Sequence, residues 1–257
     1  MTTLGAVGSK SSAGRSVVIG LLLLAVLAFA CWQLLASLNY STWNWNGIWT
    51  QREMMFRGWL LTIGIAAAAL VGTFLLGLLL AAGQEMHEPV TRFISRTFVE
   101  IIRGTPLLTQ LLLGYYIVAS AFNLNDKIIA GILLLVVFES AYMAEILRGG
   151  VASIDRAQWD AARALGLTRA QTWRLVILPQ ALRRVLPGIA GQSASLVKDS
   201  SLLSVIGVTE FAKQTDLAVS NTSAPIEGYI PMAIGYLLLT LPLSWLARRW
   251  ERRMKTS

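Results

Sequence analysis

The composition of this 257-residue chain excludes most classes of soluble protein. Hydrophobic residues make up 55% of it, charged residues only 14%, and the mean hydropathy is +0.59, which together indicate a membrane protein. The formal charge of +8 would suggest a nucleic-acid partner only if the basic residues formed one patch on a soluble surface. A single cysteine and a single histidine leave little material for a disulfide, a metal site or a catalytic triad, so we expect none of these.

The N-terminal segment, residues 1–15, precedes an apolar run that we expect to be the first membrane span. The run contains LAFAC, ending at Cys31, and so resembles a signal peptide with a lipid-acceptor cysteine. It is longer than a usual signal core, and Phe29 is bulky where a small residue would be expected. We therefore expect a retained span, although the sequence alone leaves cleavage open.

Long uncharged stretches predict further spans. Four stretches of at least 20 residues contain no charged residue, and a helix needs about 20 residues to cross a hydrocarbon core roughly 30 Å thick. Two more apolar segments contain charges, namely Glu139 and Glu145 in one and Lys198 and Asp199 in the other. We predict spans there too, because the chain has too few polar residues to cover such segments in a soluble core. The six predicted spans are 16–38, 58–83, 104–122, 128–147, 185–208 and 229–247.

The basic residues predict the orientation of these spans. Six spans place both termini on one side, and with that side in the cytoplasm 16 of the 22 Lys and Arg residues lie inside and four lie outside. The positive-inside rule therefore predicts cytoplasmic termini, with a transmembrane domain over 16–250 and a cytoplasmic tail over 251–257. The basic charge is spread along a membrane face, which disfavours a nucleic-acid partner.

The loop of residues 148–184 predicts two short helices. Asp155 with Gln158, and Thr168 with Gln171, each have the spacing of a capping box, which marks a helix start. Between these starts we expect Gly166 to separate the helices.

We expect Pro179 to stop the second helix of this loop. Apolar residues, including Trp159 and Trp173, recur on both helices at helical spacing, so this stripe should be buried against the spans, the lipid interface or a partner. A DNA-binding helix-turn-helix is disfavoured because both ends of the loop are tied to spans.

Residues 159–188, WDAARALGLTRAQTWRLVILPQALRRVLPG, resemble the EAA loop of ATP-binding-cassette importer permeases. The family pattern is E-A-A, three residues and a glycine. This chain has Asp160-Ala161-Ala162 and Gly166, with Asp in place of the usual Glu. Three neighbouring stretches resemble the polar-amino-acid branch of the family over about residues 100–211: RGTPLLTQLLLGYY, SAYMAEILRGGVASIDRAQWDAA and LVKDSSLLSVIGVTE.

The resemblance implies an all-α integral membrane protein of the MetI-like type, with about six transmembrane helices and a cytoplasmic helix-turn-helix coupling loop. In the family, the short helix of this loop fits a groove on a cytoplasmic ATPase. Asp160, Ala161, Ala162 and Gly166 would lie at that joint, where small residues allow close approach and a glycine allows a sharp turn. The chain has no phosphate-binding loop, so we expect no enzymatic activity and no bound cofactor, with ATP used by the partner.

The implied function is import of polar amino acids across the bacterial cytoplasmic membrane. The implied partners are an ATPase dimer, an identical or homologous second permease, an extracytoplasmic solute-binding protein, the amino acid and membrane lipid. The sequence leaves open which amino acid is carried. The alternative is an autonomous ion-coupled transporter with Glu139 or Asp199 as a proton relay. Inverted repeats would favour it, and none is evident by eye.

Polar residues within the spans are the candidates for cargo contact. A charged group at the centre of a span costs about 2.5 to 3.5 kcal/mol on insertion scales, so each is a functional candidate, with a helix-packing network as the alternative. Lys198 and Asp199 would point about 100° apart and offer both signs of charge to an amino acid. The predicted pathway residues are Glu139, Tyr142, Gln110, Gln192, Lys198 and Asp199.

Two i,i+3 pairs are expected near the cytoplasmic ends of the spans. Glu100 and Arg103 have this spacing, and so do Glu145 and Arg148. We expect the first pair to serve a structural role.

Overall fold

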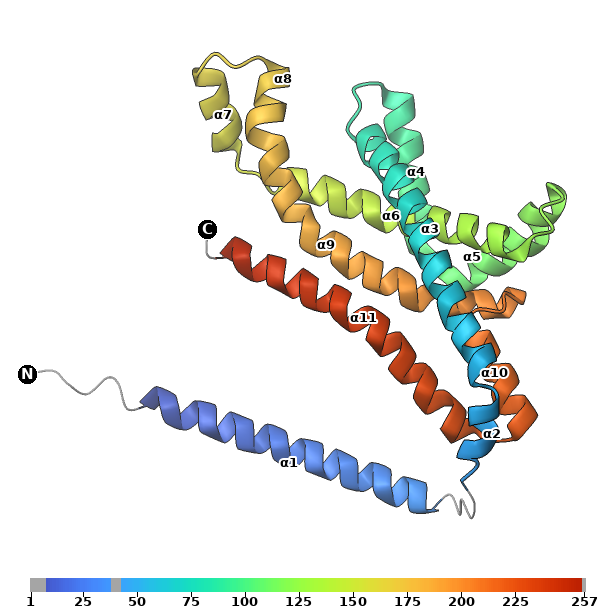
Figure 1. Cartoon of the computed structure of the whole chain (residues 1–257). Coiled ribbons are helices and arrows are strands. Elements are labelled where there is room, and N and C mark those ends of the chain that lie inside the picture. The colour runs from blue at the N-terminus through green and yellow to red at the C-terminus, as the bar shows by residue number, and fades with distance from the viewer. Residues whose placement is uncertain (1–7, 38–42, 256–257) are drawn as a thin grey trace, which may run out of the picture. The chain divides into compact units, whose positions relative to one another are not determined.

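The computed structural model describes residues 8–37 and 43–255, and all the elements in these ranges are helical (Figure 1). The predicted all-α membrane class is therefore confirmed. Predictions for residues 1–7 and 256–257, at the two expected cytoplasmic ends, lie outside the described residues. The chain divides into Met1–Asn44 and Trp45–Ser257, which are described separately.

The first unit contains one helix, α1 (Gly8–Ser37), which begins before the predicted span 16–38. Its apolar part, Val18–Ala30, is shorter than a helix of membrane-spanning length. The large apolar side chains described in it, from Val18 to Trp32, are exposed. A helix that is apolar on all sides needs lipid or a protein neighbour around it.

In the part of the second unit that the structure describes, three helices are long and apolar enough to cross a membrane, and a bent pair would make a fourth. The predicted number of six spans is therefore not confirmed and stays a prediction. The long helices are α3 (Arg52–Gln84), α6 (Lys127–Ala152) and α11 (Pro225–Lys255). The bent pair is α4 (Pro89–Gly104) with α5 (Leu107–Leu113) and its π-helical continuation η1 (Gly114–Ala119). Two short helices, α2 (Trp45–Thr50) and α10 (Phe211–Thr222), lie near the start of α3.

The bend between α4 and α5 changes the predicted span 104–122. The two helices meet at 107°, because Thr105 precedes Pro106 and is extended, with φ −121° and ψ 146°. The amide of Gln110 donates to the carbonyl of Ile102 at 2.7 Å and to the Thr105 hydroxyl at 2.7 Å. Gln110 thus satisfies the carbonyl oxygen of Ile102, which Pro106 leaves without a backbone donor.

A carboxylate in the exposed turn between α3 and α4 caps the N-terminus of α4. Glu88 accepts hydrogen bonds from the backbone of Val90 at 3.0 Å and of Thr91 at 2.5 Å. Hydrogen bonds from Thr91, side chain and backbone, and from Val90 hold the pKa of the Glu88 carboxyl below its usual value. An ionised Glu88 also suits the positive end of α4.

The expectation that Pro179 ends a loop helix is wrong. One helix runs from Arg169 to Asp199 as α8 (Arg169–Gln171), π-helical η2 (Thr172–Ile177) and α9 (Leu178–Asp199). Because Pro179 cannot donate a backbone hydrogen bond and its ring crowds the preceding turn, the wider π turn before it lets the helix continue.

The predicted boundary between the loop 148–184 and the span 185–208 is therefore absent from the helical backbone. The continuous helix Arg169–Asp199, called the rod below, already begins within the loop, at Arg169. At the other end, α9 gives way to the 3₁₀ helix η3 (Ser200–Ile206), which ends at Gly207 in the left-handed region with φ 83°. Residues 185–199 of the predicted span are thus the C-terminal part of a longer helix, and residues 200–208 lie beyond its end.

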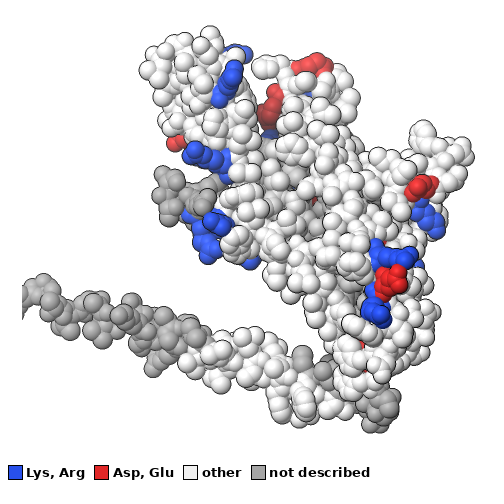
Figure 2. Space-filling view, viewed as in Figure 1, with Lys and Arg blue, Asp and Glu red and all other residues white. Residues whose placement is uncertain are grey.

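Charged side chains gather towards the ends of the Trp45–Lys255 unit in Figure 2, and the band between them is nearly uncharged on that face. Its core is aliphatic and includes the fully buried Ile65 of α3, Leu111 of α5, Leu135 of α6 and Leu196 of α9. Such a band is expected of a bundle whose middle lies in hydrocarbon.

Helices α3 and α6 approach closely through small residues. Ala69 of α3, and Ala141 and Ala144 of α6, are completely buried. A Cβ atom added at Gly77 of α3 would lie 2.8 Å from Cβ and Cγ of Met143 and 3.2 Å from the carbonyl oxygen of Ser140. The absence of a side chain at Gly77 therefore sets the distance between these helices.

We predict that Gly77→Ala lowers the stability of the bundle by about 1–3 kcal/mol relative to Gly64→Ala, because the added methyl group overpacks the α3–α6 contact. Gly64 is the matched control, since it is on the same helix and an added Cβ there would meet nothing within 4 Å. Both changes gain similar helix propensity, about 1 kcal/mol. Thermal unfolding of the detergent-solubilised protein, followed by tryptophan fluorescence, measures the difference; equal melting temperatures would contradict the close approach.

Candidate functional site

Most of the helix caps that the sequence predicted for the two-helix loop are present. Helix α7 (Arg156–Ala164) begins at Asp155, whose carboxylate accepts the backbone N–H of Ala157 at 2.9 Å. Thr168 and Gln171 form a complete capping box. The Asp155 box is half formed, because the Gln158 side chain accepts a hydrogen bond from Gln180 at 3.2 Å.

The turn between the helices depends on Gly166. This residue has φ +72°, in the left-handed region that glycine adopts at little cost. An added Cβ there would meet nothing within 4 Å, so the turn is open on its outer side.

The apolar stripe of the loop is only partly buried, within the loop itself, and Trp173 stays 42% exposed. The rings of Trp159 on α7 and Trp173 on η2 meet edge to face with centroids 5.5 Å apart. Ile154, Ile177 and Ala181 are buried beside them. The packing makes α7 a firm attachment to the Arg169–Asp199 rod.

The four residues predicted at the joint do not all face outward. Asp160, Ala161 and Gly166 are exposed, whereas Ala162 is 2% exposed and packs inward. Asp160 and Arg163 form only a loose ion pair at 4.0 Å. The outer surface of α7 therefore offers a carboxylate, a small residue and an open turn to a partner.

Three of the six predicted pathway residues come together between α6 and α9. Glu139 is completely buried, and the side-chain amide of Gln192 donates a hydrogen bond to its carboxylate. The carboxyl group of Asp199 interacts with the same carboxylate. The result is a polar cluster inside an apolar bundle.

The other three predicted pathway residues lie elsewhere. Lys198 is exposed, whereas Asp199 is half-buried near Glu139, so the two side chains lie in different environments. Tyr142 packs against Phe138 with ring centroids 5.2 Å apart. Gln110 bonds the backbone at the α4–α5 bend.

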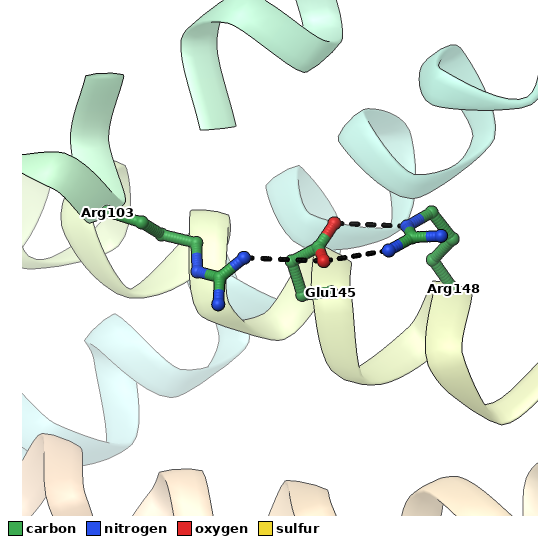
Figure 3. A network of polar contacts seen from close by, with 3 residues as sticks. All are labelled: Arg103, Glu145 and Arg148. Carbon is green, nitrogen blue, oxygen red and sulfur yellow. Dashed lines mark hydrogen bonds and ion pairs between the residues drawn. The ribbon is translucent and has the colours of Figure 1, made fainter. Parts of the chain in front are cut away.

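A second charged cluster joins the end of α4 to α6 (Figure 3). Both oxygens of Glu145 accept hydrogen bonds from Arg148, at 3.0 and 2.9 Å, and Arg103 approaches the same carboxylate to 3.3 Å. The expected Glu145–Arg148 pair is confirmed. Arg103 pairs across helices with Glu145 rather than with Glu100 along its own helix. This happens because the α4–α5 bend brings the end of α4 against α6.

Sequence reasoning missed the buried carboxylate of Glu210. Its side chain caps α10 by accepting the backbone N–H groups of Ala212 and Lys213, each at 2.9 Å. It also accepts hydroxyl hydrogen bonds from Tyr236 of α11 at 2.7 Å and Thr62 of α3 at 3.2 Å. An acidic residue directly before a helix start is a recognisable cap signal, but its long-range partners leave no local pattern.

We predict that Tyr236→Phe destabilises the bundle by about 1.5–3 kcal/mol, because it removes a hydrogen bond to a buried carboxylate. Tyr229→Phe is the matched control on the same helix, since the Tyr229 hydroxyl bonds the exposed Asp216 at 3.2 Å. Thermal unfolding in one detergent compares the two variants. Equal shifts would contradict the role of the Glu210 cluster.

An all-helical membrane bundle that carries a two-helix loop on one of its own core helices is the architecture of a transporter permease. The sequence of residues 73–256 matches the family described as binding-protein-dependent transport system inner membrane component. The chain belongs to this family.

Relatives and a solved structure agree with this placement. The chain is 37% identical to the glutamine transport system permease protein GlnP of Escherichia coli K12, over 82% of this chain and 98% of the relative. It is 32% identical to the inner membrane amino-acid ABC transporter permease protein YhdY of the same organism, over 88% of this chain and 64% of the relative. The crystal structure of an amino acid ABC transporter with histidines matches with TM-score 0.77 and 34% identity, over 82% of this chain and 99% of that chain.

Proposed function

We propose that this chain is the membrane-spanning permease subunit of an ATP-driven, binding-protein-dependent importer of polar amino acids, with both termini in the cytoplasm. The observation that carries the proposal is the loop of α7 and α8, which continues without a break into the core helix α9. Its similarity to permeases of amino-acid importers supports the class of cargo.

Energy enters through the outer surface of α7. The exposed Asp160, Ala161 and Gly166 form a shallow surface against which an ATPase subunit can fit closely, and Ala162 holds α7 to the rod from the inner side. Exposed arginines on the loop, such as Arg163 and Arg169, can pair with acidic residues of the partner. Motion of the partner then moves α7 and, through the Trp159–Trp173 contact, the rod.

The rod delivers that motion to the polar cluster. Gln192 and Asp199 lie on α9, and both interact with Glu139 of α6. A shift of α9 along α6 would remake these contacts. We therefore assign the cluster to the cargo path, with Lys198 and Tyr142 as further pathway residues. We assign Gln110 to stabilising the α4–α5 bend by its hydrogen bonds.

The remaining partners are those expected for a permease subunit of a binding-protein-dependent importer. A second permease, identical or homologous, completes the passage, an ATPase dimer binds on the cytoplasmic side, and a solute-binding protein delivers the cargo outside. ATP is used by the ATPase, and this chain holds no cofactor.

We predict that Gly166→Leu lowers ATP-driven uptake by about tenfold while membrane insertion is retained. An L-residue in the left-handed region costs about 1–2 kcal/mol, and the larger side chain also fills the open side of the turn. The control is Gly149→Leu, at an exposed glycine of α6 where an added Cβ also meets nothing within 4 Å. Uptake and ATPase activity are measured in vesicles that contain the whole transporter.

Two results would overturn the coupling proposal. One is normal uptake by Gly166→Leu. The other is accumulation of amino acid on an ion gradient by vesicles that contain this chain alone, which would favour an autonomous ion-coupled transporter. If Gly166→Leu assembles poorly, Ala161→Leu tests the same surface, because Ala161 is exposed and ordinary helix backbone.

We predict that Asp199→Asn changes the apparent affinity or rate of uptake by about tenfold and leaves assembly intact, because it removes one charge from the cluster but keeps its shape. Asp216→Asn is the control, since Asp216 is exposed on α10. Uptake kinetics are compared with the yield of assembled complex. A variant that simply fails to assemble would favour a helix-packing role.

A further inference from the structure

The charged cluster around Glu145 has more donors than its own carboxylate can use. We propose that Arg96 and Arg103 of α4, with Gln84 of α3, form a binding site for a phosphate group at the meeting point of α3, α4 and α6. The ligand is a phosphate-bearing anion, and its natural source is the headgroup of an anionic phospholipid. This site is separate from the coupling loop and the cargo path, and the inference does not depend on what the transporter carries.

A polar cavity of about 330 Å³ forms the site. Gln84 of α3 lies at its wall, together with Arg96 and Arg103 of α4 and Arg148 of α6. Arg103 and Arg148 are partly exposed, at 44% and 37%, and Glu145 between them is 23% exposed. The cavity is therefore open to a ligand from outside, unlike the buried Glu139 cluster.

Several donors in the cavity have no acceptor. Gln84 is 4% exposed; its side-chain nitrogen makes no hydrogen bond of ordinary length and interacts only weakly with the carboxylate of Glu145. Arg96 makes no ion pair with any residue in the described part of the chain. Arg103 and Arg148 share one carboxylate, while each guanidinium carries five N–H donors. A buried amide without a partner is costly, and a bound anion would satisfy it.

The acidic neighbours set the position of the ligand. Glu145 occupies the space between Arg103 and Arg148, Glu100 also lines the cavity, and Glu85 lies near Arg148. These carboxylates would repel an anion placed among them. We therefore assign the phosphate to Arg96, Gln84 and Arg103, because Arg96 is the cavity arginine that has no carboxylate within ion-pair distance among the described residues. Guanidinium groups match phosphate oxygens through paired N–H donors.

The outer face of α4 favours a lipid as the source of the phosphate. Val90, Phe93, Ile94 and Ile101 are all exposed on this helix, at 59% or more. A helix with arginines on one face and large apolar side chains on another suits the boundary between headgroups and acyl chains. Anionic headgroups attract such basic segments at the cytoplasmic surface.

The test measures binding of short-chain phosphatidylglycerol to the full-length protein, purified with its partner subunits and placed in phosphatidylcholine nanodiscs. Arg96→Gln is the variant, because Arg96 is exposed and forms no ion pair with the residues that the structure describes. Arg92→Gln is the matched control, one turn away on the same helix and outside the cavity lining. We expect Arg96→Gln to weaken binding about tenfold, the size of one lost charged hydrogen bond, and Arg92→Gln to leave it nearly unchanged.

Competition with inorganic phosphate separates the two sources of the same chemistry. If inorganic phosphate binds the native protein and Arg96→Gln weakens it equally, the anion site stands and its ligand is free phosphate. If only phosphatidylglycerol binds, the site is a lipid site. Binding of neither probe would overturn the proposal. So would equal losses in Arg96→Gln and Arg92→Gln, because that result would mean general attraction to a basic surface.

Discussion

The continuity of one helix from Arg169 to Asp199 is the constraint on which the structure depends. A helix transmits displacement along its axis because its backbone hydrogen bonds leave little freedom between turns. At one end of this rod the tryptophan pair attaches α7; at the other end Gln192 and Asp199 contact Glu139. A loop joined to the bundle by flexible chain would lose that connection, whereas here α7 packs on the same continuous helix that carries Gln192 and Asp199.

The buried carboxylates show two ways of placing charge in an apolar bundle. Glu210 accepts two backbone and two side-chain hydrogen bonds, so it is satisfied and joins α3, α10 and α11. Glu139 is as deeply buried, but a second carboxyl group, that of Asp199, is near enough to interact with it. Two neighbouring carboxyl groups repel each other when both are ionised, so the pair is unfavourable as a purely structural contact. The first cluster therefore suits a fixed joint, and the second suits a place where contacts change.

The sequence predicted the class, the loop and its caps because those depend on local signals. Thr168 with Gln171, and Gly166 between the helices, are short-range patterns with one physical outcome each. Long-range partners were harder to predict. Arg103 has an equally spaced Glu100 on its own helix, yet the fold gives it Glu145. Ala162 looked like a contact for the partner, but only packing reveals that it faces inward. Spacing specifies which residues share a helix face, not what covers that face.

Pro106 and Pro179, two of the prolines that follow a helical turn, explain why the span boundaries were the least predictable feature. Both lack the backbone donor, so both interrupt the hydrogen-bond ladder. Before Pro106 the chain leaves the helix at Thr105, and the amide of Gln110 satisfies the freed carbonyl oxygen of Ile102 at a bend of 107°. Before Pro179, Leu178 keeps helical angles of −58° and −44°, and a π turn absorbs the missing bond. A side-chain amide donates to a backbone carbonyl near each proline, Gln110 to Ile102 and Gln180 to Val176, so the difference lies in the backbone: it is extended at Thr105 and stays helical at Leu178. The first outcome brings Arg103 to Glu145, and the second joins the loop to the core.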